Sequence, residues 1–269
     1  MRRIFKGLAF TAVMMLASSS LADPIGLTVN DIDKHLYRIG LFNGTATDVG
    51  PTGFDDLEGL AIDPTSGILY AVDDTTETLV TINQMTGAAT AVGSLAPETS
   101  YDSGLAFNAA GRLIMSNEDH AGKTHFYDVN KVTGSATWLS QSYVQSIDGI
   151  ASIAGVWYGA SAHTDMIYEF DPDTGSTTSI FDLSTMMAEL DGEVGGGAEG
   201  NSLFFIDDFG DAIEYDVVTK SLYLLPFINS AFEFEGLAVV PEPTAVVGLA
   251  SLAGFGLLFG WRRRRNTKK

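Results

Sequence analysis

The apolar and polar positions of this chain repeat in a fixed order about every 45 residues. Segments with alternating apolar and polar residues flank short turns, a pattern typical of β-hairpins. The clearest two copies, residues 36–50 and 79–93, align without gaps and are identical at seven of 15 positions. Further copies begin near Phe126, Ile167 and Ala212, so the chain contains a five-fold hairpin repeat.

Each hairpin is expected to reverse direction at a two-residue turn whose second residue has a positive φ. Glycine occupies that position in four copies, and Lys220 occupies it in the fifth, so we expect the fifth turn to differ. The five turns are Asn43-Gly44, Thr86-Gly87, Thr133-Gly134, Thr174-Gly175 and Thr219-Lys220.

A second repeated element, a Gly-Leu-Ala-like segment, also occurs five times. Its copies begin 40 to 47 residues apart, at Gly59, Gly104, Gly149, Gly196 and Gly236. Another short strand follows each of the first four copies, at residues 68–72, 113–115, 156–158 and 203–205. Four strands in such a span match the size of a β-propeller blade. Glycine and alanine fit a crowded innermost strand, and the leucine or isoleucine between them is expected to pack between blades.

The two ends of the repeat region complement each other. Residues 25–31 correspond to residues 68–74, the second strand of a blade, and the hairpin 36–50 follows them. The missing first strand of that blade is found at residues 236–240. We therefore predict an all-β fold, a five-bladed β-propeller with 3+1 strand closure over residues 23–240, which hides the sheet edges. A β-sandwich would not need the repeat period, and a β-solenoid would not need complementary ends.

Large aromatic residues recur along the predicted strands. We expect them to fill the space between blades rather than to form a surface on which a ligand stacks. They are Phe170, Phe204, Phe205, Tyr215, Phe227 and Phe232.

Both ends of the chain have the pattern of targeting segments. Residues 1–22 contain a basic start, a short apolar run and small residues before Asp23, which predicts a cleaved signal peptide. Residues 244–261 carry no charge and are long enough for a transmembrane helix. Trp261 and the cluster Arg262, Arg263, Arg264 and Arg265 follow, and such a basic flank stays cytoplasmic.

The motif Pro241, Glu242 and Pro243, then the apolar run, then the arginines, resembles the PEP-CTERM sorting signal. This resemblance covers residues 241–269 and implies processing by an exosortase-type enzyme in a Gram-negative bacterium that makes exopolysaccharide. The expected route is an inner-membrane-anchored intermediate and then the cell surface or the extracellular matrix.

The net charge of the predicted propeller restricts the classes of partner that it can bind. It holds 33 of the 34 acidic residues and six of the 15 basic residues. Such a negative field repels nucleic acid and attracts cations. The chain has no cysteine, which excludes disulfides and thiolate metal sites.

Acidic residues recur where the first strand of a blade begins and where the second ends, which is the same face of a propeller. Carboxylates converging there are typical ligands of calcium, although acidic residues in turns also cap backbone N–H groups. The candidate metal ligands are Glu58, Asp102, Asp148, Glu193, Glu235, Asp73, Asp74, Asp207 and Asp208.

Signals for catalysis are weak. The chain has no Gly-x-Ser-x-Gly, His-Glu-x-x-His or phosphate-binding glycine loop, and its four histidines are scattered. The sequence favours a non-enzymatic binding or structural module at the cell surface, associated with exopolysaccharide. The alternative is a cation-dependent hydrolase acting on glycans or lactones, and no catalytic residue is nominated.

Overall fold

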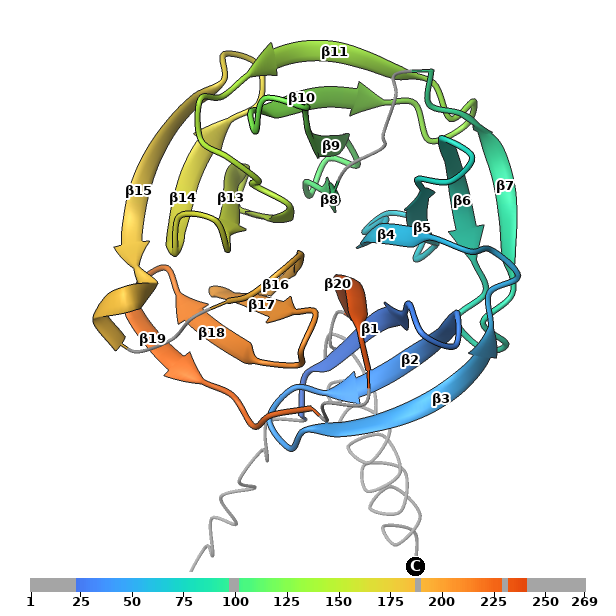
Figure 1. Cartoon of the computed structure of the whole chain (residues 1–269), viewed down its shortest axis with the longest axis horizontal. Coiled ribbons are helices and arrows are strands. Elements are labelled where there is room, and N and C mark those ends of the chain that lie inside the picture. The colour runs from blue at the N-terminus through green and yellow to red at the C-terminus, as the bar shows by residue number, and fades with distance from the viewer. Residues whose placement is uncertain (1–22, 97–101, 187–189, 229–231, 241–269) are drawn as a thin grey trace, which may run out of the picture.

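A computed structural model describes residues 23–96, 102–186, 190–228 and 232–240. In this part of the chain, five four-stranded antiparallel sheets form the blades of a ring (Figure 1). The closing blade comprises β20 (Phe234–Val240), β1 (Ile25–Asn30), β2 (His35–Gly40) and β3 (Thr45–Pro51). The second comprises β4 (Leu57–Ile62), β5 (Leu69–Asp73), β6 (Thr78–Ile82) and β7 (Ala89–Ser94).

The third blade comprises β8 (Ser103–Phe107), β9 (Leu113–Glu118), β10 (Thr124–Val129) and β11 (Ala136–Gln141). The fourth comprises β12 (Gly149–Ile153), β13 (Val156–Ser161), β14 (Met166–Asp171) and β15 (Ser176–Asp182), followed by the 3-10 helix η1 (Leu183–Met186). The fifth comprises β16 (Val194–Glu199), β17 (Ser202–Asp207), β18 (Ala212–Asp216) and β19 (Ser221–Leu224). The prediction of five blades is confirmed.

The 3+1 closure is also confirmed. The last described strand, β20, pairs antiparallel with the first, β1, and the register sets Ile25 opposite Val240 and Asn30 opposite Phe234. The first and last strands of the described residues therefore belong to one sheet, and this pairing closes the ring (Figure 1).

The innermost strands β4, β8, β12, β16 and β20 approach one another so closely that glycine is required. A Cβ atom on Gly104 would lie 1.9 Å from the carbonyl oxygen of Asp148. A Cβ atom on Gly195 would lie 2.4 Å from the carbonyl carbon of Gly236. Four of the five Gly-Leu-Ala-like segments have a leucine or isoleucine, and all four are buried as predicted; these residues are Leu60, Leu105, Ile150 and Leu237.

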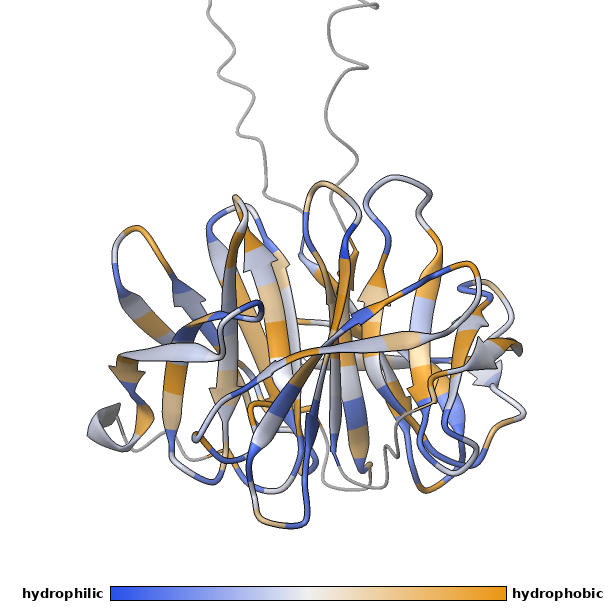
Figure 2. Cartoon of the chain, turned by 90° about the horizontal axis from the view of Figure 1, so that it is seen from above, coloured by the Kyte–Doolittle hydropathy of each residue, from blue (hydrophilic) through white to orange (hydrophobic). Residues whose placement is uncertain are grey.

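Apolar side chains fill the spaces between neighbouring blades, and hydrophobic and hydrophilic residues alternate along the strands (Figure 2). Of the aromatic residues predicted to pack there, Phe170, Phe204, Phe205 and Tyr215 are at most 4% exposed. Phe232 packs partly buried against the cluster around Phe234. The prediction is wrong for Phe227, which is 51% exposed because it follows the short last strand β19 rather than lying within a sheet.

The connections between the third and fourth strands of each blade, here called the outer turns, are longer than the two-residue turns that we predicted. In each, the N–H of the glycine position donates to the carbonyl four residues earlier at 2.8 Å. Lys220 makes this same hydrogen bond, to Asp216, and adopts a φ of 55°. The expectation of a different fifth turn is therefore wrong. The Asp216 carboxylate accepts the N–H groups of Val218 and Thr219, which fixes the turn without glycine.

The predicted signal peptide, sorting motif, transmembrane helix and arginine cluster lie outside the described residues. Within residues 23–96, 102–186, 190–228 and 232–240, no helix is both long and apolar enough to cross a membrane.

Candidate functional site

One face of the ring holds a cavity of about 440 Å³ that only carboxylate residues line. The ring topology explains why, because the five innermost strands all begin on this face and acidic residues stand at or just before several of those beginnings. We call this cavity the mouth. Its lining residues are Asp31, Asp56, Glu58, Asp74, Asp102, Glu193 and Glu235.

Three of these side chains converge from three different blades. Carboxylate oxygens of Glu58, Glu193 and Glu235 all lie within 4.8 Å of one another. Glu58 and Glu235 are buried, at 7% and 8% exposed. The Glu58 Oε2 atom accepts the N–H of Ser103 at 2.7 Å, which orients its carboxylate across the blade boundary. The Oε2 atom of Glu235 is buried and has no hydrogen-bond partner in the described part of the chain.

Burial and mutual repulsion make ionisation of these three glutamates costly. Burial raises the pKa of Glu58 well above its usual range, and the charges of Asp74 and Glu235 raise it further. The pKa of Glu193 is also raised, first by burial and then by a hydrogen bond to Glu235. Burial raises the pKa of Glu235, whereas that hydrogen bond lowers it.

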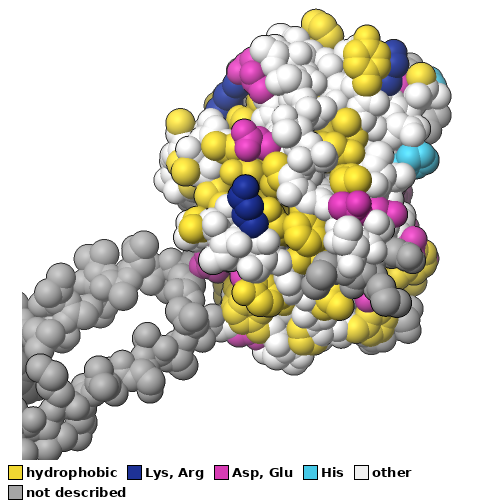
Figure 3. All heavy atoms as spheres, turned by 90° about the vertical axis from the view of Figure 1, so that its left-hand side faces the viewer, with side chains coloured by type: hydrophobic (Ala, Val, Ile, Leu, Met, Phe, Trp, Pro, Cys, Tyr) yellow, Lys and Arg dark blue, Asp and Glu magenta, His cyan; other side chains and the backbone are white. Residues whose placement is uncertain are grey.

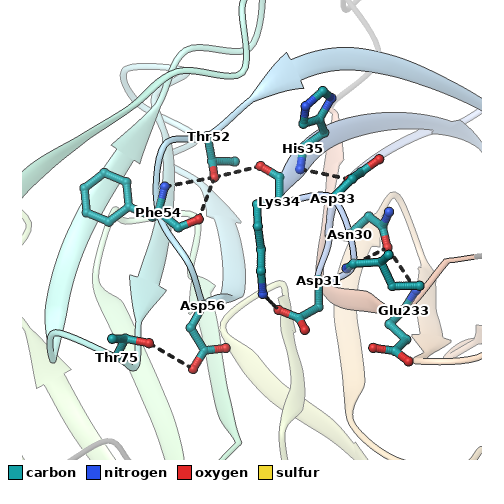
Figure 4. A network of polar contacts seen from close by, with 11 residues as sticks. Asn30, Asp31, Asp33, Lys34, His35, Thr52, Phe54, Asp56, Thr75 and Glu233 are labelled. Carbon is teal, nitrogen blue, oxygen red and sulfur yellow. Dashed lines mark hydrogen bonds and ion pairs between the residues drawn. The ribbon is translucent and has the colours of Figure 1, made fainter.

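At the rim of the mouth, a lysine neutralises one acid. Lys34 Nζ forms an ion pair with Asp31, as Figure 4 shows. Asp56 lies near this pair and its Oδ2 accepts a 3.4 Å hydrogen bond from the Thr75 hydroxyl. Asn30, which ends β1, accepts the N–H of Glu233 at 3.0 Å and ties the rim to the segment before β20. One ion pair and two hydrogen bonds thus hold the side chains of the rim in place.

A second cavity, of about 490 Å³, adjoins the mouth through the shared residues Asp102 and Glu193. Asp208 lines it, and burial, followed by the charge of Glu235, raises the pKa of Asp208 to about 7. The remaining lining residues include Glu118, Ser146, His163 and Asp191.

The other predicted metal ligands are used by the backbone. Asp148 accepts the N–H groups of Gly149 and Val194 at 3.2 and 3.1 Å, so it joins the fourth blade to the fifth. Asp207 accepts three backbone N–H groups, including that of Asp211 at 2.8 Å. Neither residue lines the mouth or the second cavity.

Asp73 is buried beside the mouth and accepts a hydrogen bond from the Thr76 hydroxyl. Of the nine predicted ligands, five therefore line the mouth: Glu58, Asp74, Asp102, Glu193 and Glu235.

The nine predicted ligands do not include Asp31 and Asp56, which line the mouth, or Asp191, which lines the second cavity. Asp56 stands two residues before Glu58, so its position just ahead of an innermost strand was the available signal.

The opposite end of the central channel has a different character. A cavity of about 200 Å³ there is lined mainly by the C-terminal halves of the innermost strands, including Ala61, Ala151 and Ala198, and by no acidic residue. On the outer wall seen in Figure 3, acidic and basic side chains are scattered among apolar ones. Carboxylates thus concentrate at the mouth, which makes it the candidate binding site.

Solved structures with the same fold share little sequence with this chain. A chain of the nidogen/laminin complex shares 14% identity over 80% of this chain and 84% of that one, with a TM-score of 0.52. A protein of unknown function from Bacteroides thetaiotaomicron VPI-5482 shares 15% identity over 76% of this chain and 55% of that one, with a TM-score of 0.54. At such identities the likeness shows the fold alone.

No curated protein matches the chain. Residues 43–202 match the family model described as a repeat of unknown function, DUF6923. The match runs from the turn between β2 and β3 to the first residue of β17. Because this match covers more than half of the sequence, the chain belongs to the DUF6923 family.

Proposed function

We propose that this protein is an exported binding or structural module, sorted through its PEP-CTERM-like tail and displayed with the acidic mouth facing away from the membrane. The observation that carries the proposal is the direction of β20. This strand runs from Glu235 at the mouth to Val240, which pairs with Ile25, and Ile25 in turn pairs with Gly40. Gly40 precedes an outer turn, so Val240, the residue that the tail follows in the sequence, lies on the face opposite the mouth.

The side chains of that opposite face support the same orientation. Equivalent positions in four of the five outer turns carry apolar residues that are 44% to 81% exposed; they are Phe42, Met85, Val132 and Val218. Apolar turn tips are compatible with a face turned towards lipid, whereas a mouth lined by seven acidic residues is not.

The dimensions of the mouth favour binding over catalysis. A glycosidase needs two carboxyl groups about 5 to 9.5 Å apart with a sugar ring between them. The three converging glutamates bring their oxygens within 4.8 Å, which suits an ion better than a sugar. The alternative, a cation-dependent hydrolase acting on glycans or lactones, is favoured only by the second cavity, where His163 lies among acids.

The partners follow from this arrangement. An exosortase-type enzyme would process the tail, and exopolysaccharide would meet the outward-facing mouth. Direct contact between an acidic polysaccharide and this mouth is repulsive, so such contact requires a bridging cation.

The sorting step is tested in a host that possesses an exosortase. We expect the native chain to be cut near Pro241 and the Glu242→Ala variant to stay at full length in the membrane fraction, as read by C-terminal mass spectrometry. A native tail that remains uncut in such a host would contradict the proposal.

The orientation is tested on the uncut Glu242→Ala chain in spheroplasts. The sequence has no cysteine, so single cysteines give clean labelling sites. Ile32→Cys places a thiol between β1 and β2 on the mouth side, and Met85→Cys places one on the tail side; the native residues are 60% and 81% exposed. A bulky maleimide should label Ile32→Cys faster in spheroplasts and both variants equally in detergent. Equal rates in spheroplasts would overturn the orientation.

A further inference from the structure

The three converging glutamates of the mouth form a better-defined site than a general acidic surface. Glu58 comes from β4, Glu193 immediately precedes β16, and Glu235 comes from β20, so three blades each contribute one carboxylate. Oxygens within 4.8 Å of one another can all contact one ion at the usual calcium–oxygen distance of about 2.3 to 2.6 Å. The repeat alone does not produce this cluster, because the acidic residues of the other two blades do not join it. Asp148, for example, accepts backbone N–H groups instead.

A second and independent observation points to a ligand. Glu235 is more than nine-tenths buried, and its Oε2 atom has no hydrogen-bond donor within the described residues. A buried carboxylate oxygen without a partner costs free energy, and native proteins rarely leave one unsatisfied. A bound cation would supply the missing partner.

Among the residues that the structure describes, no lysine, arginine or histidine lines the mouth to take that place. All seven residues that line the mouth are acidic, and Lys34, at the rim, is paired with Asp31. The N–H of Ser103, which points at the cluster, donates its hydrogen bond to Glu58.

We propose that Glu58, Glu193 and Glu235 together bind one divalent cation, with calcium preferred. The donors are all carboxylate oxygens, which select hard cations over zinc or copper. Calcium is favoured over magnesium because it accepts six to eight oxygens in flexible geometry, and the seven-acid cavity leaves room for water molecules to complete the shell. The proposal shares its site with the proposed function but does not depend on how the chain is sorted.

The position of the site gives the ion a structural consequence. It would link β4, β16 and β20, and β20 is the strand that closes the ring. A cation that binds the folded ring and not the unfolded chain raises the melting temperature as its concentration rises. The site would therefore couple closure of the propeller to extracellular calcium.

The test uses the purified full chain in detergent. Calcium binding is measured by isothermal titration calorimetry, and melting is followed in calcium chloride, magnesium chloride and sodium chloride at matched ionic strength. We expect one calcium per chain, a rise in Tm of about 5 °C or more at 100 times the dissociation constant, and a smaller rise in magnesium.

Three variants, Glu58→Gln, Glu193→Gln and Glu235→Gln, each remove one charge at nearly constant shape. Each should weaken calcium binding about 100-fold or more, since even groups that only support a ligand contribute about 10- to 100-fold. Their melting temperature without calcium should stay the same or rise, because repulsion in the cluster falls; a residue needed only for folding would lower it. Asp55→Asn is the matched control, since Asp55 is an exposed acid on the same face that does not line the mouth.

Equal responses to calcium and sodium, or a calcium response that survives Glu235→Gln, would overturn the proposal. These measurements are independent of membrane sorting. Calcium binding together with failed tail cleavage or failed orientation would reject only the proposed function, and the reverse result would reject only the cation site.

Discussion

At several outer turns a glycine lies directly against the backbone of the neighbouring blade, so substitution of such a glycine tests how closely the blades must pack. Gly87, in the turn between β6 and β7, has a φ of 79°, and a Cβ atom there would lie 2.1 Å from the carbonyl oxygen of Gly50 in β3. The same arrangement recurs in two further blades. A Cβ atom on Gly134 would lie 2.3 Å from the carbonyl oxygen of Gly93, and one on Gly175 would lie 2.0 Å from that of Gln141. Gly87→Ala therefore tests a contact used along the ring.

Gly67→Ala is the matched control, because it places alanine in the same left-handed conformation without a steric clash. Gly67 has a φ of 72°, close to that of Gly87, and nothing lies within 4 Å of its added Cβ atom. Its cost is the left-handed conformation alone, about 1 kcal/mol. Gly87→Ala adds a carbon–oxygen overlap of about 1 Å, which forces β3 and the turn apart, and such overpacking costs about 1–3 kcal/mol more.

The expected total for Gly87→Ala is thus about 2–4 kcal/mol. In a domain of this size each kcal/mol lowers Tm by about 2–4 °C, so Gly87→Ala should lower it by about 4 to 16 °C and Gly67→Ala by about 2 to 4 °C. Calorimetry and urea unfolding of the two variants beside the native chain measure the difference. Equal destabilisation by both variants would show that the blades separate at this turn without cost, and the inter-blade reasoning would be wrong.

Two further predictions concern the side chains of the same face. Lys220→Gly should stabilise the protein by about 0.5 kcal/mol, because it relieves the left-handed strain at a φ of 55°. The greater freedom of glycine in the unfolded chain offsets part of this gain. Calorimetry should show a rise in Tm of about 1 to 2 °C, and a lower Tm would contradict the prediction. Lys131→Met should cost about 1–2 kcal/mol at pH 7 by urea unfolding, because Lys131 Nζ lies 2.6 Å from buried Asp63 but is itself partly exposed. Burial would raise the pKa of Asp63, but hydrogen bonds from Lys131, Thr65 and Ser66 hold it well below its usual range. The ion pair therefore stabilises the folded protein above about pH 4, and this stabilisation is lost as pH falls through the lowered pKa of Asp63. The unfolding free energies of the native and Lys131→Met proteins should converge in acid, and a difference between them that does not change with pH would contradict the prediction.

The sequence predicted the blade count and the closure because both rest on backbone periodicity. Residues 25–31 and 236–240 could be matched to strands of other blades without knowledge of any side-chain contact, and the observed pairing of Ile25 with Val240 follows from that match. Burial within strands was predictable for the same reason. Phe227 was misplaced because it lies beyond the last residue of β19, where alternation no longer determines which way a side chain faces.

The fifth outer turn was mispredicted because glycine was taken as the cause of the turn. In four blades an asparagine or aspartate begins the turn, and its side chain accepts a backbone N–H two residues later. This side chain fixes the turn, and glycine is needed for a different reason, the approach of the neighbouring blade. Lys220 adopts the same left-handed backbone conformation as the glycines of the other four outer turns, and a comparison of residue types alone could not indicate this.

The nine predicted ligands include the three converging glutamates but do not distinguish them from the other acids, and the reason lies in what each carboxylate contacts. Asp148 and Glu58 occupy the same position ahead of or within an innermost strand, and each accepts a backbone N–H from the next blade. Asp148 gives both of its oxygens to backbone N–H groups, whereas Glu58 is one methylene longer and also reaches Glu193 and Glu235. Glutamate at three of the five innermost strands, rather than acidity in general, thus brings oxygens together at the axis, and side-chain length is the sequence feature that distinguishes a blade-joining aspartate from a candidate ligand.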